Sequence, residues 1–253
     1  MQLPFRAIAF DVDDTLTKSK QPLTDELGLL LSTLGSIVPV AILTGGKLEQ
    51  IQNQILRRIP DITYSNFFLF PSGASSAYSF SEDGTPVTLY EHTLLPEEVS
   101  HIVATAHSVI EESGVNKGHT LYGEVIEARG SSVALSLLGQ LAPPEVKRDF
   151  DPHQEKRLLL LPLLQEKLKG YDVKIGGLTT IDITKEGIDK AYGIQKFSEI
   201  IGIAEEDILY VGDALYEGGN DSAVLKTKVK IKAVDNSEAT QIFLERILHE
   251  IPL

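Results

Sequence analysis

The sequence predicts an α/β protein in which a Rossmann-like parallel sheet is interrupted by an inserted α+β domain. Near the start of the chain, short apolar runs alternate with amphipathic segments, as in Phe5–Phe10 followed by a helical pattern over 24–35. The same alternation returns after Lys185, behind a stretch with a different rhythm. Polar turns follow the apolar runs at Asp11–Thr15 and Thr44–Gly46, where parallel strands would end and ligands usually bind.

Three buried strands are expected in the first part of the core, over residues 1–85. They are the apolar runs Phe5–Phe10, Val38–Leu43 and Phe67–Phe70. Thr24 is placed to cap the helix that follows the first run, and Gly35 is placed to end it. A second helix is expected from the apolar face formed by Leu48, Ile51, Ile55 and Ile59.

The insertion is predicted over 86–184. Its expected elements are Val87–Tyr90 (β), Glu97–Glu112 (helix), a hairpin around Gly130-Ser131, and two strands at Asp172–Ile175 and Leu178–Ile183. A helix is also indicated over Gln154–Lys169, but Pro162 costs about 3 kcal/mol in a helix interior, so we expect a kink or a later start. The second part of the core, 185–253, is expected to contain helices at Lys190–Ile201 and Ser237–His249 and strands at Ile208–Val211 and Val229–Val234.

The composition indicates a soluble globular protein without a nucleic-acid partner. Hydrophobic residues make up 42% of the 253 residues, and the net charge is −13. Non-specific nucleic-acid binding needs a basic surface, which this balance does not supply. The absence of cysteine excludes disulfides and thiolate metal sites. We recognise no signal peptide, and the longest apolar run, Leu158–Leu164, is too short to span a bilayer, so we expect a cytoplasmic protein without a membrane partner.

Carboxylates crowd the end of the first expected strand, at Asp11, Asp13 and Asp14. Like charges this close raise one another's pKa values unless a cation neutralises them, and carboxylate oxygens suit a hard cation such as Mg²⁺. A solvated acidic turn is the alternative interpretation of so short a motif. A calcium-binding EF-hand loop is excluded, because Leu16 and Pro22 stand where that loop requires Gly and Glu.

Further polar residues follow the other expected core strands. Thr44 follows the second strand, Lys190 begins a helix, and Asp213 precedes Gly218-Gly219-Asn220-Asp221. Taken singly, they fit a strand-end cap, a solvated helix residue and a turn. Together with Asp11 they supply a carboxylate nucleophile, a hydroxyl donor, a lysine and a metal-binding aspartate, which is what phosphoryl transfer requires.

In this order the motifs resemble those of the haloacid dehalogenase (HAD) superfamily of aspartyl-phosphate phosphotransferases. The insertion resembles the α/β cap of the Cof-type and sugar-phosphatase branch, and nearly the whole chain is similar to eukaryotic-type phosphomannomutases. Ile126-Glu127-Ala128-Arg129 resembles that family's Ile-Glu-Phe-Arg. The other resembling segments are Gly176-Gly177-Leu178 (Gly-Gly-Met), Glu186-Gly187-Ile188-Asp189-Lys190 (Glu-Gly-Trp-Asp-Lys) and Gly218-Gly219-Asn220-Asp221 (Gly-Gly-Asn-Asp).

The resemblance implies a role for each core motif. Asp11 would be the nucleophile that forms an aspartyl phosphate, and Asp13 the general acid and base. Thr44 and Lys190 would hold the phosphoryl oxygens, with Gly45 and Gly46 as substrate-binding residues of the same turn. The Mg²⁺ cofactor would be bound by the carboxylates of Asp11 and Asp213 and the backbone carbonyl of Asp13, with Asp221 supporting the ion or its waters. Asp14 stands at a position that is often Gly in the superfamily.

The insertion departs from that family where a distal phosphate would bind. Phosphomannomutases use several arginines there, and in the cap Arg129 alone matches one of them. The other expected arginine positions carry Lys20, Tyr122 and Gln140. Thr180 and Asp182 match the family's sugar-contacting serine and aspartate in kind. Because each lost charge-assisted hydrogen bond typically costs about 1.5–3 kcal/mol, a second phosphate is expected to bind weakly.

These residues predict a Mg²⁺-dependent phosphatase that acts on a hexose phosphate or related phosphosugar. The alternative is a phosphomannomutase that interconverts mannose 1-phosphate and mannose 6-phosphate with a rebuilt distal site. A third hypothesis, a non-catalytic sugar-phosphate or protein-binding module, is disfavoured by the complete motif set. The resemblance also implies a homodimer formed through the cap.

Overall fold

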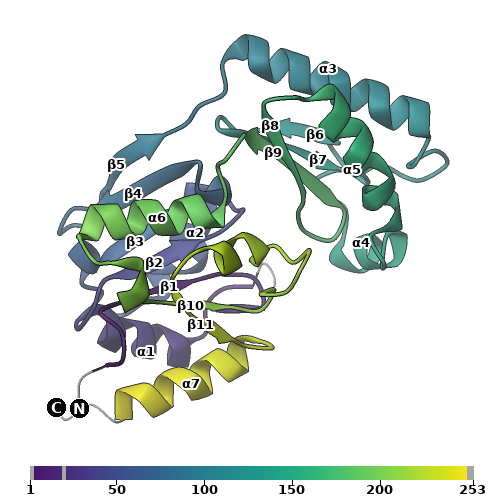
Figure 1. Cartoon of the computed structure of the whole chain (residues 1–253). Coiled ribbons are helices and arrows are strands. Elements are labelled where there is room, and N and C mark those ends of the chain that lie inside the picture. Colours follow the sequence, from purple (N-terminus) through teal and green to yellow (C-terminus); the bar gives the residue numbers. More distant parts are fainter. Residues whose placement is uncertain (1–2, 19–20, 250–253) are drawn as a thin grey trace. The chain divides into compact units, whose positions relative to one another are not determined.

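The computed structural model describes residues 3–18 and 21–249 (Figure 1). The chain divides into two compact units, which we call the core and the cap. The core is built from residues 1–91 and 189–253, and the cap from His92–Ile188. Among the described residues, no helix combines the length and the apolar character that crossing a bilayer would demand.

A seven-stranded sheet lies at the centre of the core, with the strand order β11-β10-β1-β2-β3-β4-β5. The strands from β11 to β3 pair in parallel, whereas β4 and β5 pair antiparallel. Parallel strands joined by helices confirm the predicted α/β class. The strand bounds are β1 Ala7–Phe10, β2 Val40–Leu43, β3 Phe67–Phe70, β4 Ser76–Phe80, β5 Pro86–Glu91, β10 Ile208–Gly212 and β11 Lys230–Ala233.

Strands β4 and β5 extend the core sheet in a way that differs from the sequence prediction. Strand β4 was not expected, and the segment at 86–91 was expected to open the inserted domain. Instead, β5 pairs with β4 along its whole length, from Ser76↔Glu91 to Phe80↔Pro86. Val87 and Leu89 remain exposed on this edge strand. The apolar residues of β5 that alternate with Thr88 face solvent, and Tyr90 packs against a core cluster, so the pattern alone does not show to which domain the strand belongs.

Helices cover both faces of the core sheet. Alternate side chains of β1 point to opposite faces, so that Ile8 joins one apolar cluster and Ala9 joins the other. The first cluster includes residues of α1 (Asp25–Gly35), α2 (Leu48–Gln54) and α7 (Ser237–His249), and the second includes residues of α6 (Lys190–Ile201). Short 3₁₀ helices lie at Leu56–Arg58, Tyr64–Asn66, Ser72–Ala74, Glu205–Asp207 and Ser222–Lys226.

Gly35 is needed for a different reason from the one expected. Thr24 caps α1 as predicted, since its Oγ1 accepts a hydrogen bond from Leu27 N at 3.3 Å. Gly35, however, remains helical, and the C-cap residue is Ser36. A Cβ atom at Gly35 would overlap the ring of Phe67. Glycine is therefore required by the close approach of α1 to β3, and not by a left-handed helix end.

The cap contains a four-stranded antiparallel sheet with the order β6-β7-β9-β8. Val133 of β7 and Ile181 of β9 meet Leu160 of α5 in one apolar cluster. Helix α5 begins at Glu155 and continues through Pro162, so the expected later start is wrong. The element bounds are α3 Pro96–Ser113, β6 Ile126–Ala128, β7 Ser132–Ser136, α4 Pro144–Phe150, α5 Glu155–Lys167, β8 Tyr171–Ile175 and β9 Thr180–Lys185.

Candidate active site

Three carboxylates meet at the carboxyl ends of the core strands. Asp11 directly follows β1, Asp213 directly follows β10, and Asp221 lies at the end of the loop after β10. One oxygen atom from each carboxylate lies within 4.8 Å of the other two. The parallel pairing of β1 with β10 brings Asp11 and Asp213 together, because parallel strands end at the same edge of a sheet.

Lys190 is the first residue of α6, and its ammonium group lies between two of these carboxylates. The Lys190 Nζ atom donates to Asp11 Oδ1 at 2.6 Å and also to Asp221 Oδ1. Asp189 caps the helix by accepting a hydrogen bond from Tyr192 N at 3.1 Å, which fixes where α6 begins. Lys190 is buried, so its charge acts on the two carboxylates with little screening by solvent.

Tyr210 and Thr15 contact this cluster, although neither was predicted as a site residue. The Tyr210 hydroxyl donates to Asp221 Oδ1 at 2.7 Å from within β10. The Thr15 hydroxyl donates to Asp213 Oδ1 at 3.3 Å. Sequence reasoning treated Tyr210 as one apolar residue of a buried strand. The signal that could have found it is its hydroxyl, because a buried phenol needs a hydrogen-bond partner.

Two glycines allow the loop after β10 to fold back on itself. A Cβ atom at Gly212 would overlap the Asp221 carboxylate, and one at Gly219 would overlap the carbonyl of Ala214. Asp221 Oδ2 also accepts a hydrogen bond from Ala214 N at 3.3 Å. The loop can therefore return Asp221 to the end of β10 only because these positions carry no side chain.

The electrostatics of the cluster favour a bound cation. Burial raises the pKa of Asp11 to about 7; the Lys190 charge opposes this rise, and the Asp221 charge adds to it. Burial, followed by the charge of Asp221, also raises the pKa of Asp213. Asp11 Oδ2 is buried without a hydrogen-bond partner among the described residues. A set of three carboxylates, one ammonium group and a free buried oxygen atom fits a hard divalent cation such as Mg²⁺.

We expect the metal-free protein to lose stability as the pH rises from about 4 to about 7. Folded Asp11 keeps its proton up to about pH 7, whereas an aspartate in the unfolded chain loses it near pH 3.8. Between these values the folded state binds more protons, so a higher pH favours unfolding. Thermal melts in EDTA measure this loss, and Mg²⁺ should reduce it near pH 7. An equally steep loss in an Asp11→Asn variant would contradict this explanation.

The turn after β2 lies at the same edge of the sheet. Thr44 is buried, and its Oγ1 atom accepts a hydrogen bond from Gly46 N at 3.0 Å. Gly46 O accepts a hydrogen bond from Ser72 N at 2.9 Å, which ties the turn to the segment after β3. Since β2 pairs in parallel with β1, the predicted phosphate-binding turn of Thr44, Gly45 and Gly46 follows the strand next to Asp11.

Asp13 and Asp14 lie in the turn that follows Asp11. The carboxylate of Asp13 is not one of the three that cluster in the described part of the chain. Asp13 instead forms a short β-bridge with Thr17, and Asp14 N donates to Thr17 O at 2.7 Å. Asp14 has a φ of 57°, in the left-handed region that Gly adopts freely and Asp tolerates better than most residues. This left-handed backbone conformation therefore explains why a short polar residue occupies position 14.

A second group of polar side chains lies on the cap sheet. The Arg129 Nε atom donates to Glu127 Oε2 at 2.8 Å, and its Nη2 atom donates to Gln140 Oε1 at 3.1 Å. Arg129 Nη1 also lies 3.8 Å from Asp182 Oδ1. Glu127 and Asp182 are both cross-strand neighbours of Ala134 and so project from the same face. We call Glu127, Arg129, Gln140 and Asp182 the cap polar patch.

The remaining predicted cap residues relate to this patch in different ways. Thr180 precedes Asp182 by two residues on β9, so its side chain points to the same face of the sheet. The Tyr122 side chain packs against the apolar cluster of the cap. Lys20 lies outside the described residues. The structure therefore brings Arg129, Gln140 and Asp182 together and gives Tyr122 a packing contact.

Comparison with known proteins relates most of the chain to one family. The family model for eukaryotic phosphomannomutase matches residues 28–250. A phosphomannomutase of Spinacia oleracea is 26% identical over 251 residues, which cover 94% of this chain and 95% of that protein. Among solved structures, an IMP-bound, N-terminally truncated IMP-nucleotidase of Plasmodium falciparum has a TM-score of 0.70 at 18% identity, over 97% of this chain and 68% of that chain. A haloacid dehalogenase-like hydrolase from Bacteroides thetaiotaomicron has a TM-score of 0.65 at 15% identity, over 96% of this chain and 99% of that one.

Proposed function

Because this chain belongs to the eukaryotic phosphomannomutase family, we propose that it is a phosphatase that transfers the phosphoryl group of a hexose phosphate or related phosphosugar to Asp11 and then to water. The family is part of the HAD superfamily, so the chain is a phosphoryl-transfer enzyme that acts on phosphosugars. Whether water or a sugar hydroxyl receives the phosphoryl group is decided by how the substrate's distal end is held. We choose water as the acceptor because acidic neighbours in the cap polar patch already compensate the charge of Arg129.

In the proposed reaction, an oxygen atom of the Asp11 carboxylate attacks phosphorus and forms an acyl phosphate. The bond between phosphorus and the sugar oxygen breaks, and this oxygen takes a proton from the Asp13 carboxyl group. Asp13 then accepts a proton from a water molecule whose oxygen attacks the same phosphorus. The acyl phosphate bond breaks, inorganic phosphate leaves, and the Asp11 carboxylate is restored.

The chain's own groups support this sequence of steps. Lys190 offers positive charge beside Asp11, where the transferred phosphoryl oxygens would lie, and Thr44 offers a hydroxyl at the next strand end. We assign Mg²⁺ to the carboxylates of Asp11, Asp213 and Asp221 and to the backbone carbonyl of Asp13. When bound, the ion supplies positive charge that neutralises the phosphoryl oxygens and allows the anionic nucleophile to approach them.

The cap polar patch favours a substrate with a single phosphate. Arg129 has two acidic neighbours in the patch, Glu127 and Asp182, so its positive charge is already compensated. Gln140 adds no charge and occupies another guanidinium nitrogen. A second phosphate would have to displace these partners, whereas sugar hydroxyls can accept from and donate to the same groups. Without a site that binds the distal phosphate firmly, a bisphosphate intermediate would dissociate before it could reorient for the second transfer.

Two observations favour the mutase as a second candidate. The family match covers residues 28–250, and the Spinacia oleracea relative carries the name phosphomannomutase. In addition, Lys174 is the cross-strand neighbour of Asp182, which gives this face of the cap sheet a second cation. Its Nζ atom donates to Asp172 Oδ2 at 3.1 Å, so it too has an acidic partner.

Phosphorus NMR of the products distinguishes the two candidates. The protein is incubated with Mg²⁺, mannose 1-phosphate and a trace of hexose 1,6-bisphosphate. We expect the signal of inorganic phosphate to grow; a growing 6-phosphate signal without free phosphate would instead identify a mutase. A Gln140→Arg variant should shift the product ratio toward the 6-phosphate, because it adds a guanidinium group beside Arg129 at the distal site.

Other expectations about the chain remain predictions of its sequence. A homodimer through the cap is in keeping with the exposed apolar side chains of Leu158, Leu159 and Leu163 on α5. The cytoplasmic location and the absence of nucleic-acid and membrane partners likewise rest on composition and on the patterns of the sequence.

A further inference from the structure

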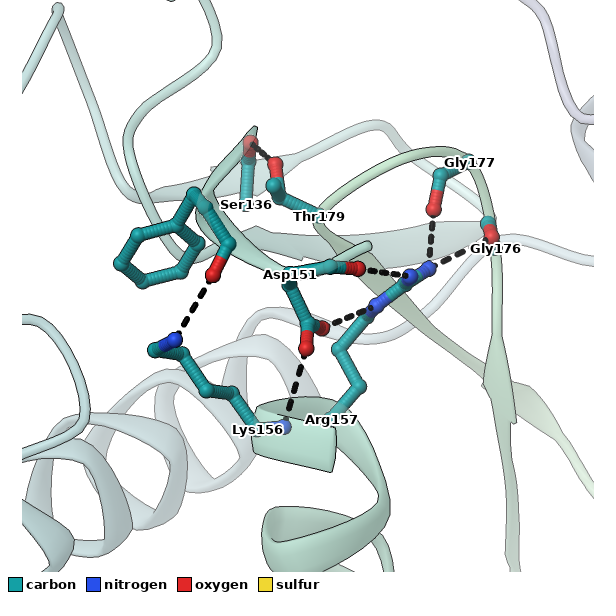
Figure 2. Close-up of polar contacts among 8 residues, drawn as sticks. Ser136, Asp151, Lys156, Arg157, Gly176, Gly177 and Thr179 are labelled. Carbon is teal, nitrogen blue, oxygen red and sulfur yellow. Dashed lines mark hydrogen bonds and ion pairs between the residues drawn. The ribbon is translucent and has the colours of Figure 1, made fainter. Parts of the chain in front are cut away.

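Arg157 is almost completely buried in the cap, yet no step of the proposed reaction uses it. It lies near the start of α5 and is 3% exposed, as is its partner Asp151. The Arg157 Nε atom donates to Asp151 Oδ2 at 2.8 Å, and Nη2 donates to the Asp151 carbonyl at 3.5 Å (Figure 2). A buried ion pair is not by itself a source of stability, since desolvation offsets much of the attraction. The other contacts of the guanidinium group therefore decide what Arg157 contributes.

The third nitrogen of the guanidinium group reaches the turn between β8 and β9. Arg157 Nη1 donates to the carbonyl of Gly176 at 3.2 Å and also to the carbonyl of Gly177 (Figure 2). A second anchor follows within the same turn, where the hydroxyls of Thr179 and Ser136 lie 3.3 Å apart. The turn is thus tied to α5 through a charge-assisted contact and to β7 through a hydroxyl pair.

This turn leads directly into two residues that we assign to the substrate. Gly176 N donates to Thr180 O at 2.9 Å, which closes the turn. A Cβ atom at Gly176 would overlap Asp182 Oδ2, so the Asp182 carboxylate packs directly against the backbone that Arg157 holds. A shift of the Gly176 carbonyl would therefore move the surface on which Asp182 rests and the start of the strand that carries Thr180.

We propose that Arg157 is a positioning residue that holds the Gly176-Gly177 turn, and with it Thr180 and Asp182, in the geometry that binds the sugar end of the substrate. The inference rests on the proposed function, because only that function assigns the last two residues to the sugar. Asp151 is also part of this arrangement. Its Oδ1 atom accepts a hydrogen bond from Lys156 N at 3.0 Å, so the same carboxylate satisfies a backbone N–H in the first turn of α5 and orients the guanidinium group.

The planar fork of arginine is essential to this arrangement. It directs separate nitrogens to Asp151 and to the two carbonyls, whereas a lysine at position 157 would keep the charge but present one compact ammonium group. Arg157→Lys therefore separates the two roles that the residue could have. It leaves Asp151 paired with a cation, and it removes the fixed geometry of the turn.

The test compares two phosphoryl donors on the full chain with Mg²⁺: mannose 1-phosphate, whose sugar needs the cap, and acetyl phosphate, which carries no sugar. For Arg157→Lys we expect the KM for mannose 1-phosphate to rise about ten-fold, the size expected for one charge-assisted hydrogen bond. Its kcat and both constants for acetyl phosphate should change less than two-fold. Lys156→Met is the matched control, since its Nζ atom bonds Phe150 O at 2.7 Å and does not touch the turn; its kinetics should equal those of the wild type.

Several outcomes would overturn the proposal. One is an unchanged KM for mannose 1-phosphate in a folded Arg157→Lys variant, and another is an equal loss with both donors, which would mark a purely structural role. If Arg157→Lys does not fold, Thr179→Val replaces it, because that change removes the hydroxyl pair that also holds the turn. In that variant, a KM for mannose 1-phosphate at the wild-type value would contradict the proposal. A wild-type protein that cleaves acetyl phosphate but neither hydrolyses nor isomerises any phosphosugar would overturn the proposed function and this inference together.

Discussion

Replacing Asp11 by asparagine is expected to abolish turnover while the fold remains intact. The amide cannot form the acyl phosphate, so kcat should fall at least about 10³-fold, as is usual when a nucleophile is removed. The same change removes a carboxylate whose pKa is raised by burial, so the variant without metal should melt at or above the wild-type temperature at pH 8. Steady-state kinetics and melting curves in EDTA measure the two effects.

Asp14→Asn is the matched control for this variant. It changes a carboxylate in the same turn, and asparagine also tolerates the left-handed φ of 57° at that position. We expect its turnover to remain within about two-fold of the wild type, because its carboxylate is outside the three that cluster. An Asp11→Asn protein that retains a tenth of the wild-type turnover would rule out Asp11 as the nucleophile.

Replacing Lys190 by methionine is expected to destabilise the core strongly. The ammonium group bridges Asp11 and Asp221, and its removal leaves two buried carboxylates without their cation. Breaking such a pair typically costs about 3–5 kcal/mol. Because Mg²⁺ can supply part of the missing charge, the loss in denaturant melts should be smaller with the ion than in EDTA. Turnover should also fall about 10²–10³-fold, the usual effect of removing one group that stabilises developing charge.

Lys196→Met provides the comparison on the same helix. Lys196 Nζ contacts Glu199 Oε2 at 2.6 Å, but both side chains are partly exposed, and such pairs contribute about 0–1 kcal/mol. Its melting midpoint should therefore stay close to that of the wild type. If Lys190→Met in EDTA were as stable as Lys196→Met, the bridging role of the ammonium group would be refuted.

Much of the core could be predicted because its physical signals are local. Buried parallel strands such as β1 and β10 are short apolar runs that end in polar turns, and the residues Asp11 and Asp213 stand directly after them. Thr24 was recognisable by the side-chain oxygen that caps a helix. Strand β5 could not be assigned in this way, since its edge position leaves most of its residues exposed and its partner β4 is itself weakly patterned.

The sequence by itself determined the α/β class, the order of the catalytic motifs and the superfamily, because each depends on residue types at fixed spacings along the chain. Only the tertiary structure decided which side chains meet. It brought Tyr210 to Asp221, pressed Gly35 against Phe67 and joined Arg157 to the Gly176-Gly177 turn. These contacts depend on strand register and helix packing, which link residues far apart in the chain and leave no periodic trace in the sequence.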